Sequence, residues 1–205
     1  MEHAPMKHKK HIFSLAVILA GTATAAFALP PVPSRPYLES IQIIYGSDPA
    51  LRCFNAARDG VELRNGLDYC NTAVIDPLMN YRAETLVNRG IVLYNLGNRN
   101  DALADFNTAI NYNPSLGDAY LNRAMVLISL NRNPEALDAI NRGIALGASN
   151  LQLAYYNRAE IEEDAGRNAE AYRDYKQALA IKPDYAAAER QLQRFQVRPR
   201  GTNSP

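Results

Sequence analysis

Tryptophan is absent from this chain, and its histidines, His3, His8 and His11, all lie near the N-terminus. Beyond them there is no histidine for general acid–base catalysis, for Ser–His or Cys–His nucleophile pairs, or for a zinc site. The phosphate-binding loop Gly-x-x-x-x-Gly-Lys-Ser/Thr does not occur either. These absences exclude most classes of enzyme, and we expect no catalytic residue, no cofactor and no metal.

One acidic run remains as a candidate for chemistry. It contains Glu160, Glu162, Glu163 and Asp164, and it lacks the spacing of a calcium loop. We interpret the run as a solvated acidic helix end. An enzyme that uses carboxylates alone is the remaining catalytic alternative, although no pair of carboxylates stands out.

The N-terminal residues combine positive charge with a long uncharged run. The basic stretch Lys7–His11 precedes residues 12–28, which carry no charge and end in Ala26-Phe27-Ala28. A basic region, an apolar region and a small-x-small site are the three parts of a secretory signal peptide, here residues 1–28. An uncleaved membrane anchor is the alternative, but a bilayer needs about 20 apolar residues, so the run is marginal. A proline-rich segment follows at residues 29–47.

The net charge gives no reason to expect a strongly charged ligand. The whole chain has 22 basic and 21 acidic residues, and removal of residues 1–28 takes away three lysines and one glutamate, which leaves 19 and 20. Such a balance indicates neither nucleic acid nor an anionic membrane as a partner. We therefore expect a periplasmic or secreted protein, with no nucleic-acid partner and no stable membrane insertion after signal cleavage.

Cysteine is scarce, since the chain has only Cys53 and Cys70. They lie on either side of a break at Asp59-Gly60, in segments 48–58 and 61–73 that are predicted to be helices. From the break the two arms measure roughly 10 and 14 Å at 1.5 Å per residue, so both cysteines are expected near one level. In an oxidising compartment this arrangement predicts a disulfide. Two buried free thiols are the alternative.

A triplet recurs along the chain at nearly constant spacing. It reads Asn88-Arg89-Gly90, then Asn122-Arg123-Ala124, then Asn157-Arg158-Ala159, in steps of 34 and 35 residues. This is the length of one helix–turn–helix unit. The small third residue allows two helices to approach closely. Because such a unit cannot bury its apolar face alone, the units are expected to stack.

The turns within the units have their own signals. Gly97 and Gly166 suit the left-handed conformation that ends many helices, and Asn131 suits it in the middle unit. Pro114 and Pro183 close the first and third units.

Gly90, Ala102, Phe106 and Pro114, and later Ala171, Tyr175 and Pro183, match the pattern of the tetratricopeptide repeat family. The chain resembles an exported bacterial member of that family over residues 83–185, as three units at 83–116, 117–151 and 152–185. It departs from the pattern at the tryptophan position, which holds Leu86, Tyr120 and Tyr155. The resemblance implies an all-α, right-handed solenoid of stacked helix–turn–helix units.

Further segments flank the three units. Residues 48–76 form a predicted helical hairpin of repeat size that lacks the triplet, and we interpret it as a degenerate first unit. Residues 186–196 predict a capping helix, because the open end of a solenoid needs a polar outer side. Residues 197–205 have few apolar side chains and predict a flexible tail.

In the resembling family, the first helices of the units line a concave groove that holds a partner peptide or helix. The residues at the corresponding positions are Val87, Asn88, Ile91, Tyr94, Leu121, Asn122, Met125, Ile128, Tyr156, Asn157, Glu160 and Glu163. Some members clamp a carboxylate there with lysine and arginine. Val87, Ile91 and Leu153 take those places here, so a carboxylate clamp is not expected.

The triplet residues allow two roles. The asparagine amides either bond a partner's backbone or hold neighbouring helices in register. The arginines are expected to tie helices together, because Asp105 and Asp174 follow Arg89 and Arg158 by sixteen residues.

The resemblance implies a non-catalytic interaction module or scaffold that binds a protein or peptide partner in the groove. The acidic end of the third unit favours a basic segment of that partner. A self-associating structural subunit of an envelope assembly, and hence a homo-oligomer, is the alternative.

Overall fold

The computed structural model describes residues 48–76 and 81–195, and this part of the chain contains helices and no strand. The helices are α1 Asp48–Asp59, α2 Leu63–Ile75, α3 Arg82–Asn95, α4 Arg99–Tyr112, α5 Gly117–Ser129, α6 Asn133–Ala145, α7 Leu151–Asp164, α8 Asn168–Ile181 and α9 Ala186–Arg194. The predicted all-α fold of stacked helix pairs is confirmed over these residues. The predicted signal peptide, proline-rich segment and tail lie outside the described residues.

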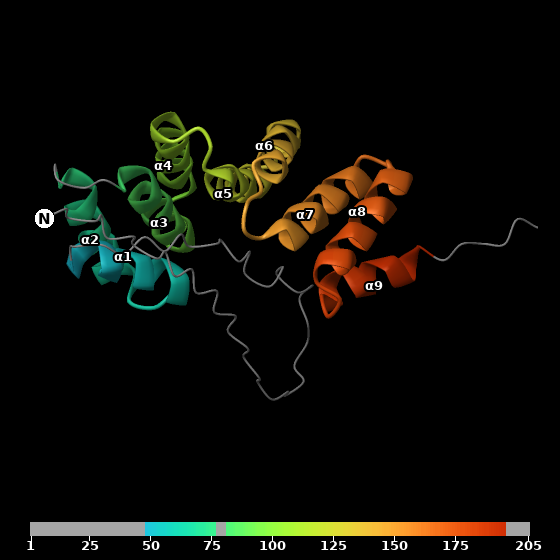
Figure 1. Ribbon diagram of the computed structural model, residues 1–205, viewed down its shortest axis with the longest axis horizontal. Coiled ribbons are helices and arrows are strands. Elements are labelled where there is room, and N and C mark those ends of the chain that lie inside the picture. The colour runs from blue at the N-terminus through green and yellow to red at the C-terminus, as the bar shows by residue number, and fades with distance from the viewer. Residues whose placement is uncertain (1–47, 77–80, 196–205) are drawn as a thin grey trace, which may run out of the picture. The chain divides into compact units, whose positions relative to one another are not determined.

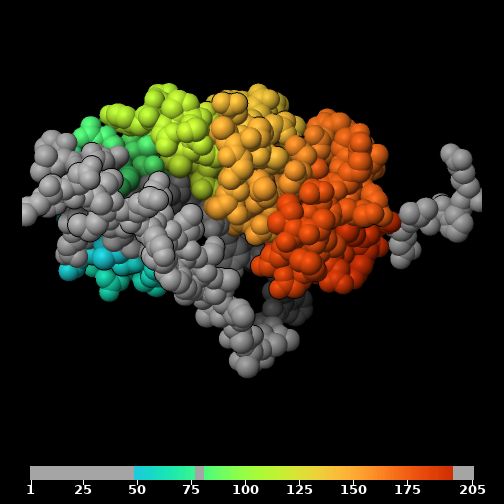
Figure 2. Space-filling model, in the orientation of Figure 1, coloured from blue at the N-terminus to red at the C-terminus, as the bar shows by residue number. Residues whose placement is uncertain are grey.

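Consecutive helices form pairs, and each pair packs on the next. The pairs are α1–α2, α3–α4, α5–α6 and α7–α8, and α9 packs on α8 (Figure 1). The second helix of each pair contacts the first helix of the next pair, and the atoms of neighbouring pairs meet directly (Figure 2). Within the described ranges, no helix has the length and apolar character needed to cross a bilayer.

The turns inside the three units share one hydrogen-bond pattern. Gly97, Asn131 and Gly166 have φ values of 87°, 57° and 77°, so the left-handed helix ends predicted from the sequence are confirmed. In each unit the next residue donates its backbone N–H to a carbonyl five residues back: Asn98 to Leu93 at 2.9 Å, Arg132 to Leu127 at 2.9 Å and Arg167 to Glu162 at 2.8 Å. These bonds satisfy carbonyls that the helix end would otherwise leave without a partner.

Close approach within a pair depends on the small third residue of the triplet. A Cβ atom placed on Gly90 of α3 would lie 2.6 Å from a ring carbon of Phe106 on α4. Phe106 is fully buried, and so are Ile140 and Tyr175 at the same place in the next two units. Ala124 and Ala159, which replace Gly90 in those units, are also buried. The small residue therefore sets the distance between the two helices of a pair.

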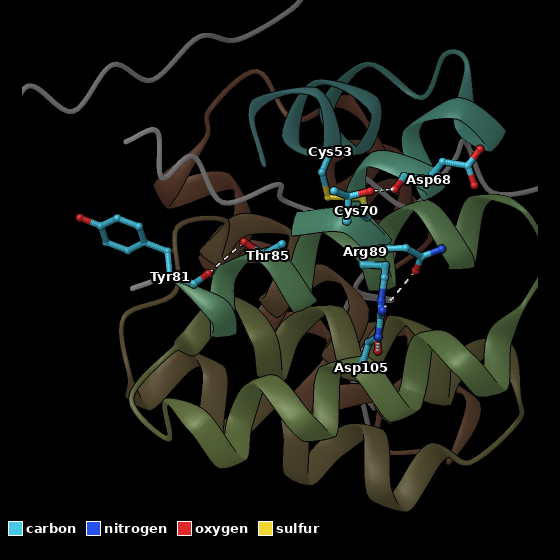
Figure 3. Close-up of a disulfide and its surroundings, with 9 residues drawn as sticks. Cys53, Asp68, Cys70, Tyr81, Thr85, Arg89 and Asp105 are labelled. Carbon is cyan, nitrogen blue, oxygen red and sulfur yellow. Dashed lines mark hydrogen bonds and ion pairs between the residues drawn. A yellow bond between two sulfur atoms is a disulfide. The ribbon is translucent and has the colours of Figure 1, made fainter. Parts of the chain in front are cut away.

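The triplet arginines tie the helices together, as their spacing from the two aspartates predicts. Arg89 donates to both carboxylate oxygens of Asp105, each at 2.7 Å (Figure 3). Arg158 donates to both oxygens of Asp174 at 2.6 and 2.8 Å. The middle unit has Ala139 at that position, and its Arg123 instead lies over the Tyr120 ring at 5.3 Å from the ring centroid.

Each of these arginines also reaches back to the preceding pair. The Nη1 atoms donate to asparagine side chains on the previous second helix: Arg89 to Asn71 at 3.2 Å, Arg123 to Asn107 at 3.5 Å and Arg158 to Asn141 at 2.7 Å. Asn71 belongs to α2, so in this contact the hairpin takes the place of a preceding unit.

The hairpin α1–α2 is closed by a disulfide between Cys53 and Cys70, as the sequence predicts (Figure 3). Their Cα atoms are 4.7 Å apart, and both side chains have no exposed area. The second helix, predicted at 61–73, runs from Leu63 to Ile75, so both of its ends were predicted two residues too early. The helix starts at Leu63 because Gly60 and Glu62 both have positive φ, which places the turn later than the Asp59-Gly60 break indicates.

Helix α9 covers the last pair. Its Ala188 is fully buried in a cluster with Tyr175 and Ala178 of α8, and Leu192 and Phe195 pack against this cluster. The Phe195 ring lies 5.9 Å from the rings of Tyr172 and Tyr175, centroid to centroid. The Arg194 guanidinium pairs with Glu163, so the C-terminal part of α9 also lies beside the end of α7.

Candidate functional site

The structure divides the twelve predicted groove residues into three groups. Those on α3 do not line an open surface: Val87, Asn88 and Ile91 are 0%, 4% and 1% exposed. Val87 and Ile91 share a core cluster with Cys53 and Cys70, because the hairpin packs on this face of α3. The prediction that Val87 and Ile91 contact a partner is therefore wrong, because both are core side chains. Tyr94 is half-buried against the same core.

A second group packs between α5 and α7. Leu121, Asn122 and Met125 of α5 lie opposite Asn157 of α7 around a cleft of about 10 Å³. A space of this size holds at most about one water molecule, so it is an interface between units and no ligand site. The Nδ2 of Asn157 donates to the Met125 sulfur at 2.8 Å. One asparagine of the triplet thus has the structural role that holds neighbouring units together.

The third group lines a larger hollow of about 300 Å³. The lining residues come from α5, α6, α7, α8 and α9 and are Ile128, Asn133, Asn157, Glu160, Ile161, Glu163, Asp164, Tyr175, Gln191 and Arg194. Ile128, Asn157, Glu160 and Glu163 belong to the predicted set. Tyr156 does not line the hollow, although its hydroxyl contacts Glu160. We call this recess the acidic hollow.

Six of the ten lining residues lie outside the predicted set. Tyr175 was identified only as a match to the repeat pattern, and Gln191 and Arg194 lie on the capping helix, which carried no site prediction. No local pattern indicates that α9 turns its end toward α7. The acidic run was the one available signal. Its interpretation as a solvated helix end holds for the exposed Asp164 but is wrong for Glu160 and Glu163, which are half-buried and hydrogen-bonded.

Tyrosine hydroxyls hold the two glutamates in place. The Tyr156 hydroxyl donates to Glu160 Oε1 at 2.8 Å, and the Tyr175 hydroxyl donates to Glu163 Oε2 at 3.0 Å. Gln191 donates to the Tyr156 oxygen at 3.4 Å, and the Arg194 guanidinium pairs with Glu163 at 3.1 Å. These bonds orient both carboxylates before any ligand arrives.

Burial and like charge shape the electrostatics of the hollow. Burial is the main cause that raises the pKa of Glu160, and the nearby charges of Asp164 and Glu163 raise it further. Burial raises the pKa of Tyr156 to about 12, and it also raises the pKa of Tyr175. Both phenols therefore stay protonated at neutral pH and act as hydrogen-bond donors to the glutamates.

The chemistry available in the hollow is that of an acceptor-rich recess. Glu160, Glu163 and Asp164 lie three and four residues apart on α7, so they share one face of the helix. Across the described part of the chain, no group of three histidine, cysteine or acidic side chains is arranged to hold a metal ion. The arrangement suits the recognition of a cationic or hydrogen-bond-donating group.

The stacked helix pairs place this chain among the helical repeat proteins. Residues 87–150 and residues 153–185 each match a family model described as tetratricopeptide repeat. The chain is a tetratricopeptide repeat protein.

Two relatives share parts of the sequence. The chain is 30% identical over 120 residues, 57% of its length, to the DnaJ homolog subfamily C member 7 homolog of Schizosaccharomyces pombe, of which it spans only 25%. It is 38% identical over 65 residues, 32% of its length, to an uncharacterized protein of Methanocaldococcus jannaschii, of which it spans 76%.

Solved structures share the fold. A crystal structure of MamA superposes with a TM-score of 0.60 at 21% identity, covering 73% of this chain and 82% of that one. The first tetratricopeptide domain of Spaghetti (RPAP3), bound to the HSP90 peptide SRMEEVD, superposes with a TM-score of 0.53 at 21% identity, covering 58% of this chain and 94% of that one. At these identities the likeness concerns the fold alone.

Proposed function

We propose that this protein is a non-catalytic interaction module, which binds a peptide or helix of a partner protein at the acidic hollow. One observation carries the proposal: an open recess of about 300 Å³ whose polar groups are already oriented by hydrogen bonds. Preformed recesses with a few fixed polar groups are where proteins bind ligands. The tetratricopeptide fold supports a protein ligand, since the RPAP3 domain with this fold holds a peptide.

The kind of peptide differs from the one that RPAP3 holds. The peptide SRMEEVD carries acidic side chains and would meet Glu160, Glu163 and Asp164 in this hollow. Like charges in a partly buried site repel, so an acidic peptide is disfavoured. The positions of a carboxylate clamp also hold no cation here, because Val87 and Ile91 are core residues.

The proposal includes export to the periplasm or beyond the cell. It is supported by the signal-peptide pattern of residues 1–28 and by the Cys53–Cys70 disulfide, a bond that persists in oxidising compartments. N-terminal sequencing of the protein purified from a bacterial periplasm tests this part, and the expected cleavage follows Ala28. Recovery of only uncleaved chain in the cytosol would contradict export.

Selection of binders from a random peptide display library tests the binding function with the full chain. Ile128→Arg places a long side chain in the hollow, and it should abolish binding of the selected peptides while circular dichroism shows an intact fold. The matched control is Ile181→Arg, because Ile181 is an exposed isoleucine at the end of α8, away from the hollow. If no peptide is enriched, or if both variants bind equally well, the proposed function fails.

Light scattering addresses the alternative of a self-associating subunit. A stable dimer that Ile128→Arg dissociates would show that the hollow contacts a second copy of the chain in place of a partner protein.

A further inference from the structure

The acidic hollow has more negative than positive charge in its lining. Glu160, Glu163 and Asp164 supply three carboxylates, and Arg194 supplies the one guanidinium among the residues that line it. A partly buried cluster of like charges is relieved by an added cation. Burial is the main cause that raises the pKa of Glu160, and the charges of Asp164 and Glu163 raise it further.

A second observation, independent of the carboxylates, concerns Asn157. This side chain lines the hollow and is only 7% exposed. Its hydrogen bond to the Met125 sulfur uses Nδ2, and its amide oxygen is not one of the buried side-chain oxygens that lack a partner. An amide oxygen accepts hydrogen bonds, so that of Asn157 can add an acceptor to the carboxylates of the hollow. The hollow therefore offers its acceptors along one face of α7, from Asn157 and from the carboxylates.

Arg194 shows what kind of group fits the rim of the hollow. Its guanidinium pairs with Glu163 at 3.1 Å and donates to Gln191 at 2.6 Å, yet its side chain is 63% exposed. Ion pairs this exposed contribute little to stability, because water and salt screen them. The contact is therefore easily exchanged for one with an incoming group of the same chemistry.

We propose that the acidic hollow binds an arginine side chain of a partner polypeptide, with Glu160, Glu163 and the amide oxygen of Asn157 as acceptors. Arg194 holds Glu163 until the partner's guanidinium displaces it. Arginine fits better than lysine because its planar guanidinium has five N–H donors and no acceptor, which suits several acceptors close together on one helix face. This inference rests on the proposed function and names the partner's chemistry.

Three labelled peptides test the inference on the full chain by fluorescence anisotropy. They share a Gly-Ser-Ala sequence and differ at one central position, which is arginine, lysine or citrulline. The arginine peptide should bind most tightly, the lysine peptide more weakly, and the citrulline peptide, which keeps the shape without the charge, weakest of all. Equal affinity for the three peptides would overturn the inference.

Two variants locate the binding. Glu163→Gln keeps the size of the side chain and should weaken the arginine peptide about tenfold, the factor expected for one hydrogen bond between charged groups. Arg194→Ala removes the guanidinium that pairs with Glu163 in the unbound protein. It should strengthen binding of the arginine peptide by roughly two- to fivefold, the range of an exposed ion pair. The matched control is Arg173→Ala, because Arg173 is 70% exposed and pairs with Glu170 on α8, away from the hollow. It should leave the affinity unchanged.

The outcomes separate this inference from the proposed function. If display selects peptides that Ile128→Arg abolishes but that contain no arginine and ignore Glu163→Gln, the inference fails while the binding function stands. If no peptide binds the hollow at all, both fail. If Arg173→Ala changes the affinity as much as Arg194→Ala does, the effect is one of overall charge and the inference is also overturned.

Discussion

Reduction of the Cys53–Cys70 disulfide should destabilise the α1–α2 hairpin selectively. The bond closes a loop with a sequence separation of 17 residues, and loss of a cross-link of this size costs about 3 kcal/mol through the entropy of the unfolded chain. Because 1.4 kcal/mol is a factor of ten, the ratio of folded to unfolded hairpin should fall by roughly a hundredfold. The hairpin lacks the triplet and its arginine, so fewer contacts between its two helices compensate for the lost disulfide.

The effect should reach α3 as well as the hairpin. Leu86, Val87 and Ile91 are at most 3% exposed, and they share their core cluster with hairpin residues. In a stack of repeats each unit is stabilised mainly by its neighbours, so an end unit can unfold while the rest stays folded. Unfolding of the hairpin would expose these side chains to water.

The assay compares oxidised and reduced protein in urea, with amide hydrogen exchange to locate the opening. Reduction should lower the unfolding midpoint and speed exchange in α1, α2 and α3, with much smaller changes in α7 and α8. A Cys53→Ala/Cys70→Ala variant provides the matched control, since it lacks the bond under both conditions and should not respond to reductant. Equal midpoints and equal exchange for the oxidised and reduced wild type would refute the reasoning.

Three further predictions follow from single contacts. Asp105→Ala should lower the free energy of unfolding by about 2 to 4 kcal/mol, because it leaves the half-buried Arg89 guanidinium without its carboxylate. A urea midpoint within experimental error of wild type would contradict this. Gly90→Ala should lower the free energy of unfolding by about 1 to 3 kcal/mol, because the added methyl carbon would lie 2.6 Å from a carbon of the Phe106 ring. The same urea titration measures this loss, and a variant more stable than wild type would contradict the prediction. The pKa of Tyr156 is raised from 10.0 to about 12, so the folded state disfavours ionisation of this phenol. The stability that this shift contributes is complete below pH 10 and is lost as the pH rises through about 12. Tyr156→Phe should therefore unfold at higher pH than wild type, and ultraviolet titration of the folded protein should lose a phenol that ionises late; an unchanged titration would show that this phenol is not shifted.

Much of the fold could be predicted from short-range patterns. Gly97, Asn131 and Gly166 marked the turns, since a left-handed helix end tolerates few other residues. The spacing of Arg89 from Asp105 and of Arg158 from Asp174 predicted ion pairs across each helix pair, because two antiparallel helices joined by a short turn bring such positions together. The start of α2 was placed too early, because the left-handed conformation of Glu62 has no signature in its residue type.

The candidate site was predicted less well. Its α7 residues followed from the repeat alignment, since one face of one helix depends only on local periodicity. The burial of Val87 and Ile91 could not be read in the same way, because it depends on the hairpin that packs against them. Gln191 and Arg194 were missed because their place beside Glu163 depends on how α9 crosses the last pair.

The sequence by itself determined the helices, their pairing and the three-unit repeat, because periodicity, turn residues and small contact residues act over distances of one helix pair. Only the tertiary structure decided which first-helix faces are core and which are open. That choice depends on the neighbour that stacks on each face: the disulfide-closed hairpin covers α3, whereas α9 leaves a hollow of about 300 Å³ beside α7. The acidic run became a candidate binding site only when side chains of α5, α8 and α9, distant in the sequence, surrounded it.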